Sequence, residues 1–195
     1  MICHVRAGRL HVLTRQSSER AFPRGVRGRT TLAVVEPRER TLHLYGAPSD
    51  RGQLAWSWVE AQLSTAGTYW LVVRTPGHPH PRPVWGIWHG QRLHLSVGSP
   101  TLLRAVNLDP LVTVHLDSGT DVVLLEGTIS RTTQYETPSS IVQAYNAKYD
   151  WDYQVAQYGE LIVVQPQRVL AWRTAGWAGR DSFQATGCWQ FDSPQ

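Results

Sequence analysis

The segment at residues 99–110, SPTLLRAVNLDP, has residue types and a spacing that could bind an anion. Ser99 is a favourable helix N-cap and a proline follows it, so the sequence predicts a short helix over Pro100–Leu108. A helix N-terminus offers free backbone N–H groups and partial positive charge, which favour a phosphate. Arg104 and Asn107 lie three residues apart on one face, and a guanidinium can bind a phosphate through two hydrogen bonds. The alternative is a solvated Arg104 and a Ser99 that only caps the helix.

A second candidate is Lys148, the single lysine of the chain, within the aromatic segment AYNAKYDWD. Its compact ammonium group, next to Tyr149 and Trp151, could face a substrate. The alternative is structural, because a lysine in the last turn of a helix is favoured by the helix dipole and the aromatic rings would seal a core. The residues alone favour the structural interpretation.

Both segments must be positioned by a scaffold that is rich in strands. Short apolar runs bounded by turn residues predict strands over Tyr69–Thr75, Pro81–His89, Arg92–Val97, Leu111–Leu116, Val122–Arg131, Leu161–Trp172 and Phe183–Phe191. Helices are expected over Gln53–Ser64, Pro100–Leu108 and Thr137–Lys148. Six to seven antiparallel strands with short helices predict a mainly β fold, a closed or nearly closed barrel.

The strand VWGIW is apolar on both of its faces. Val84, Gly86 and Trp88 alternate with Trp85 and Ile87, so both faces need cover. One face can fill a barrel, and the other can face a ligand or a second copy of the chain. The glycine in mid-strand is typical of a close approach by a flat group.

One folded domain is expected, since 195 residues suffice for one well-buried core. Residues 1–50 are rich in arginine and turn residues and are predicted to be a weakly ordered or accessory extension. They could be a flexible arm, a hairpin at the barrel edge, or an extension translated from a start codon placed too early. The barrel domain is expected over residues 51–195.

Composition and spacing argue against several classes of function. The arginine excess is concentrated in residues 1–51, and no basic stripe with interleaved aromatic residues follows, so no nucleic-acid partner is expected. Cys3 and Cys188 lie near opposite ends, which argues against a disulfide framework. His78 and His80 have no carboxylate or thiol nearby in sequence, so no metal site is expected. No apolar stretch suits a signal peptide or a membrane span, which favours a cytoplasmic protein without a membrane partner.

The run from about Trp56 to Phe191 resembles the pyridoxamine 5′-phosphate oxidase-like, FMN-binding split-barrel family, in particular its flavin- and deazaflavin-dependent oxidoreductases. The pieces that carry the resemblance occur in family order: TYWLVV followed by GHPH, RPVWGIWHGQRLHLSVGSP, RAVNLDPLVTVHLDSGTDVVLLEGT, AYNAKYDWD, and VVQPQRVLAW to CWQF.

The resemblance implies a split barrel that forms a homodimer with cofactor sites at the interface, each holding FMN or coenzyme F-420. In this sequence the implied cofactor-binding residues are Pro83, Val84, Trp85 and Gly86 beside the ring, Ser96, Val97, Gly98 and Ser99 near the phosphate, Arg104 with Asn107, and Trp189. Arg104 stands where such proteins more usually have a lysine. Trp189 follows glycine and cysteine here, in place of the more common Thr-Arg-Trp.

The activity implied by the resemblance is hydride transfer between the bound cofactor and a small organic substrate, with Lys148, Tyr149 and Trp151 on the substrate side. No catalytic acid or base is assigned, because the cofactor supplies the redox chemistry. The alternative is a flavin-binding or sensory module without turnover, or a dimeric interaction module on the same barrel. From the residues alone, Trp189 is expected to close a core.

Overall fold

The computed structural model describes residues 37–40, 42, 52–129, 136–176 and 182–192. Most of the predicted extension, residues 1–50, lies outside these ranges. The strands are β1 (Arg38–Arg40), β2 (Tyr69–Arg74), β3 (Pro79–His89), β4 (Arg92–Ser96), β5 (Leu111–His115), β6 (Asp121–Ile129), β7 (Ile162–Thr174) and β8 (Phe183–Gln190). The helices are α1 (Trp56–Thr65), α2 (Pro100–Leu108), α3 (Ser139–Tyr149) and α4 (Val155–Tyr158).

The helices follow the sequence signals to different degrees. α2 has the predicted bounds, and Ser99 caps it through its side chain, as the sequence indicates. α1 begins at Trp56, three residues later than expected, and Ala55 at its N-cap makes no side-chain hydrogen bond. The single turn α4 was not predicted. Within the described ranges, no helix combines the length and the apolar character needed to cross a membrane.

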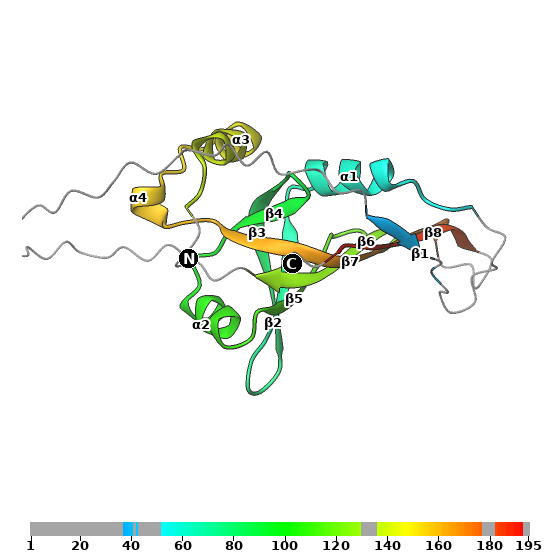
Figure 1. Ribbon diagram of the computed structural model, residues 1–195, viewed down its shortest axis with the longest axis horizontal. Coiled ribbons are helices and arrows are strands. Elements are labelled where there is room, and N and C mark those ends of the chain that lie inside the picture. The colour runs from blue at the N-terminus through cyan, green and yellow to red at the C-terminus, as the bar shows by residue number, and fades with distance from the viewer. Residues whose placement is uncertain (1–36, 41, 43–51, 130–135, 177–181, 193–195) are drawn as a thin grey trace, which may run out of the picture. The chain divides into compact units, whose positions relative to one another are not determined.

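Strand β7 closes the sheet into a barrel. The strand order is β1-β8-β7-β4-β3-β2-β5-β6, and a further pairing of β7 with β6 joins the ends of a six-stranded ring (Figure 1). All the pairings between these strands are antiparallel. The predicted split β-barrel is therefore confirmed.

Two strands extend the sheet beyond this ring. β8 pairs with β7, and β1 pairs with β8 through Arg38–Arg40. Within the part of the chain that the structure describes, the sheet thus has eight strands where six to seven were expected, because three residues of the predicted extension add to its edge. Strand β1 is short, and its three residues are charged and exposed. It therefore lacks the apolar pattern that revealed the other strands.

The two faces of β3 pack against different parts of the chain. Val84 belongs to the main barrel core, and the partly buried Trp88 packs against that core. On the other face, Ile87 joins a smaller cluster with Ile141 and Tyr145 of α3. The expected need of VWGIW for cover is thus met largely within the chain. Trp85 remains 44% exposed.

A prediction concerns Gly86, which lies where β4 leaves no room for a side chain. A Cβ at this position would lie 2.5 Å from the carbonyl oxygen of His94 and 2.6 Å from Cδ2 of Leu95. We expect Gly86→Ala to lower the free energy of unfolding by about 1–3 kcal/mol, because the backbone oxygen cannot move aside easily. Urea denaturation measures this difference.

The matched control is Gly119→Ala, since a Cβ there meets nothing within 4 Å. It should change the free energy of unfolding by less than about 0.5 kcal/mol. Equal effects of the two substitutions would show that the close approach at Gly86 does not limit stability.

Candidate functional site

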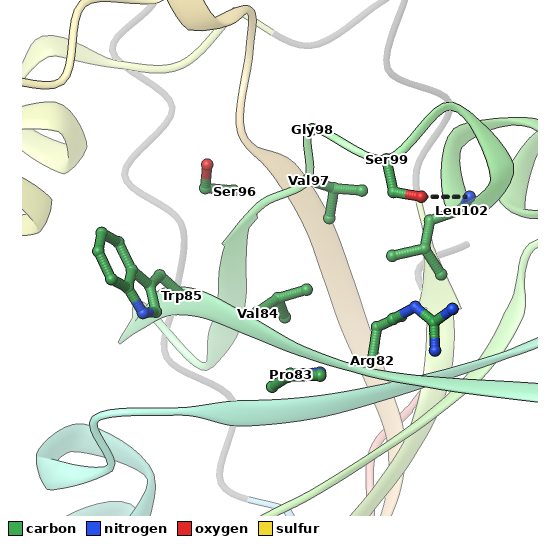
Figure 2. Close-up of a pocket in the computed structure, with 9 residues that line it drawn as sticks. All are labelled: Arg82, Pro83, Val84, Trp85, Ser96, Val97, Gly98, Ser99 and Leu102. Carbon is green, nitrogen blue, oxygen red and sulfur yellow. Dashed lines mark hydrogen bonds between the residues drawn. The ribbon is translucent and has the colours of Figure 1, made fainter. Parts of the chain in front are cut away.

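A cavity of about 340 Å³ lies between β3, β4 and the start of α2 (Figure 2). Its lining consists of Arg82, Pro83, Val84, Trp85, Ser96, Val97, Gly98, Ser99 and Leu102. The volume lies at the lower end of the range of about 300–1,000 Å³ that is typical of small-molecule sites. It is therefore large enough for a small ligand or for part of a larger one.

One continuous stretch of chain builds the cavity. β3 and β4 are neighbours in an antiparallel hairpin, with Trp85 opposite Ser96. The chain then passes through Gly98 directly into α2. Figure 2 shows Trp85 at one end of the cavity, while the guanidinium of Arg82 points toward Ser99 and Leu102 at the other. The cavity thus has a flat aromatic end and a cationic end.

The N-terminus of α2 offers fewer free donors than the sequence indicated. The Ser99 hydroxyl accepts a hydrogen bond from the Leu102 N–H at 3.4 Å, and the Ser99 carbonyl accepts one from the Leu103 N–H at 3.0 Å. Pro100 has no N–H. Of the N–H groups in the first turn, the one on Thr101 could therefore still reach an anion. Most of the charge for binding a phosphate must therefore come from a side chain.

Arg82 is the cationic residue of the cavity lining, and the sequence reasoning did not select it. Its Nη1 donates a hydrogen bond to the carbonyl of Pro81 at 3.1 Å. A signal was present in the sequence, because Arg82 lies two residues before Val84 and so shares its face of the strand. The predicted ring-binding strand began one residue later, at Pro83, and this excluded the arginine.

The other predicted cofactor residues divide into two groups. The first group lines the cavity and consists of Pro83, Val84, Trp85, Ser96, Val97, Gly98 and Ser99. Four lie outside its lining. Gly86, which follows Trp85 in β3, is buried, and Arg104 and Asn107 are exposed on α2. Trp189 is 1% exposed, with its ring centroid 5.4 Å from that of Trp56 in the main core.

The three residues predicted on the substrate side gather around Trp85 and Gly86. Lys148 Nζ donates hydrogen bonds of 3.0 Å to the Tyr69 hydroxyl and to the Gly86 carbonyl. The Tyr149 ring stacks on Trp85 with centroids 5.1 Å apart and an interplanar angle of 12°. Trp151 meets the same indole edge-on at 5.2 Å. This cluster therefore contacts the cavity through Trp85.

Burial changes the protonation of this cluster. It lowers the pKa of Lys148 from 10.5 to about 8, because the ammonium loses contact with water. Burial also raises the pKa of the Tyr149 hydroxyl, and the hydrogen bond with the Gly86 backbone partly opposes that rise. Tyr149 is thus protonated at neutral pH, whereas Lys148 can lose its charge under mildly alkaline conditions.

Comparisons with known proteins identify the architecture. No protein-family model and no curated protein matches the chain. Among solved structures, a conserved hypothetical protein from Mycobacterium tuberculosis is 18% identical with a TM-score of 0.50, over 65% of this chain and 89% of that one. A proposed 5-nitroimidazole antibiotic resistance protein from Bacteroides thetaiotaomicron is 10% identical with a TM-score of 0.50, over 71% and 88%. A proposed pyridoxamine 5′-phosphate oxidase from Listeria innocua is 21% identical with a TM-score of 0.45, over 59% and 95%.

These sequence identities are too low to support any conclusion beyond a shared fold. At that level, the two structures with a TM-score of 0.50 show a shared fold, in agreement with the split barrel that the sequence resemblance implied. The functional conclusion must come from the cavity and its residues.

The lowered pKa of Lys148 predicts a pH dependence of stability. Its folded pKa is about 8 and its unfolded pKa 10.5, so the unfolded chain binds more protons between these values. The free energy of unfolding should therefore rise with pH in this window. Lys148→Met removes this contribution, and the variant should show a smaller rise. Urea denaturation at about pH 7.5 and about pH 9.5 measures both slopes. Equal slopes would contradict the prediction.

Proposed function

We propose that the cavity binds the phosphate-bearing end and part of the ring of a flavin-type cofactor, FMN or coenzyme F-420. We propose that the protein is an oxidoreductase acting on a small organic substrate. The observation that carries the proposal is the pairing of a cationic end at Arg82 with a flat aromatic end at Trp85 in one cavity. The split-barrel resemblance supports the same ligand class.

The residues present fit such a group. A flavin or deazaflavin joins a planar ring system to a chain that bears a phosphate. Arg82 can donate two parallel hydrogen bonds to phosphate oxygens, and Thr101 can add a backbone N–H. Trp85, Val84 and Pro83 provide an apolar wall of the kind that packs against a planar ring. Arg82 and Trp85 lie at opposite ends of the cavity, with Val84 and Pro83 between them, as the two parts of the ligand require.

The bound cofactor would supply hydride transfer, and the protein would supply binding and orientation. The described residues that line the cavity include no carboxylate, histidine or lysine, and we assign none of them as a general acid or base. Val84 and Pro83 would exclude water from one face of the ring. Of the residues proposed for the substrate side, Trp151 is 43% exposed and is the best placed to meet a substrate. Lys148 uses its amine in two internal hydrogen bonds.

A cofactor titration tests this proposal. FMN or coenzyme F-420 should quench the tryptophan fluorescence of the wild-type protein. Arg82→Ala should weaken binding by about 1.5–3 kcal/mol, roughly 10- to 100-fold, because it removes a hydrogen bond to a charged group. If neither cofactor quenches the fluorescence at tens of micromolar, the proposed function is contradicted.

The matched variant is Arg104→Ala, which tests the arginine that the sequence indicated. Arg104 is exposed and lies outside the cavity lining, so its loss should cost less than about 1 kcal/mol. A larger loss of affinity in Arg104→Ala than in Arg82→Ala would indicate that the phosphate binds at the solvent-exposed face of α2. Reduction of the bound cofactor, followed by its reoxidation with a candidate substrate, separates an enzyme from a module that only binds the cofactor.

We also propose that the chain forms a homodimer with the cofactor at the interface, as the resemblance implies. Trp85 and Trp151 support this proposal, because these touching indoles are 44% and 43% exposed beside the cavity. Contiguous exposed aromatic surface is typical of an interface.

Light scattering tests the dimer. The mass should be twice the 22.0 kDa of one chain. Trp151→Glu should shift the protein toward the monomer, because a charge would be buried at the interface. Leu108→Glu is the control, since Leu108 is 80% exposed at the end of α2, outside the cavity lining. A monomeric mass at every concentration would oppose the proposal.

A further inference from the structure

The edge of β3 beside Gly86 has a gap that no strand of the described residues fills. β2 begins at Tyr69, which pairs with Val84, so Gly86 lies beyond the end of that pairing. On its other side Gly86 faces Leu95 of β4. A buried backbone N–H or C=O without a partner destabilises the fold, so the two polar groups of Gly86 need substitutes for the missing strand.

Two consecutive residues at the end of α3 provide these substitutes. The Tyr149 hydroxyl accepts a hydrogen bond from the Gly86 N–H at 2.9 Å. It lies 2.8 Å from the Gly86 carbonyl oxygen and 3.1 Å from that of Gly67, either of which can accept its proton. Lys148 Nζ donates to the same Gly86 carbonyl at 3.0 Å. We call Lys148 and Tyr149 the α3 clamp.

The clamp also contacts the residue that forms the aromatic wall of the cavity. Trp85 precedes Gly86 in the chain, and its indole stacks on the Tyr149 ring. Asp150 then ends α3 in a left-handed conformation with φ 48°, and the chain places Trp151 edge-on against Trp85. The Tyr149 hydroxyl thus holds the main chain while its ring supports the neighbouring side chain.

We propose that Lys148 and Tyr149 are positioning residues for the cavity, which set the place of Trp85 by holding both polar backbone groups of Gly86. This role differs from the substrate contact that the sequence indicated for them. The effect on ligand binding rests on the proposed cofactor site, whereas the effect on Gly86 does not.

The test uses Tyr149→Phe, which removes the hydroxyl and keeps the ring that stacks on Trp85. Hydrogen exchange followed by NMR should show the Gly86 amide exchanging about fivefold faster, as expected for the loss of a hydrogen bond worth about 1 kcal/mol. Binding of FMN or coenzyme F-420, whichever the wild type binds, should weaken about three- to tenfold. Lys148→Met should change both quantities in the same direction, since it removes a donor to the Gly86 carbonyl.

Tyr158→Phe is the matched control. Tyr158 is 46% exposed, and its ring meets Trp151 but lies outside the clamp. It should leave both the Gly86 exchange rate and the affinity unchanged. Equal changes in the control and in Tyr149→Phe would overturn the proposal.

The two readouts distinguish the possible failures. An unchanged Gly86 exchange rate in Tyr149→Phe would overturn the clamp, whatever the cofactor result. Faster exchange with unchanged affinity would show that the clamp holds the strand but does not position the cavity, which also overturns the proposal. If the wild type binds neither cofactor, the proposed function fails, and the exchange measurement alone decides whether the clamp exists.

Discussion

The pairing of β7 with β6 is the interaction on which the rest of the structure depends. β7 is 13 residues long, and its first part pairs with both β4 and β6 while its later part pairs with β6 and β8. By pairing with both β4 and β6, β7 closes the six-stranded ring. β8 pairs with the later part of β7 outside the ring, and β1 pairs with β8. Because the ring is closed, β3 and β4 are held in place from both sides. The hairpin that forms the cavity wall is therefore part of a rigid scaffold.

The cavity combines this rigid wall with a chemically simple lining. Among the described lining residues, the cation Arg82 lies at one end with the capped start of α2, and Trp85, whose indole stacks on Tyr149, lies at the other. Such a lining suits recognition of a ligand that brings its own reactivity, because it can orient a ring and neutralise a phosphate without exchanging protons. α3 contributes from outside the lining, through the backbone of Gly86 and the ring beneath Trp85.

Local signals in the sequence predicted the elements that build the site. Ser99 and the following proline gave α2 its bounds, and alternation in β3 indicated two covered faces. Arg82 shares a face of β3 with Val84, a signal that the choice of Pro83 as the first ring-binding residue passed over, and which elements that face meets depends on the tertiary structure. Arg104 was selected because helix periodicity places it on an outward face, yet periodicity cannot say whether that face meets a cavity or solvent.

The sequence by itself determined the barrel class, the short helix after β4 and the aromatic character of the segment that contains Lys148. These features follow from interactions between residues close together in the chain, such as a cap, a turn or an alternating strand. Only the tertiary structure decided which arginine lines the cavity and that Lys148 and Tyr149 hold Gly86. The core position of Trp189 was already expected from the residues. The hold on Gly86 depends on contacts across more than sixty positions, such as Gly86 with Tyr149 at a separation of 63. Contacts of that range arise from strand pairing and helix packing, so no local pattern of residues encodes them.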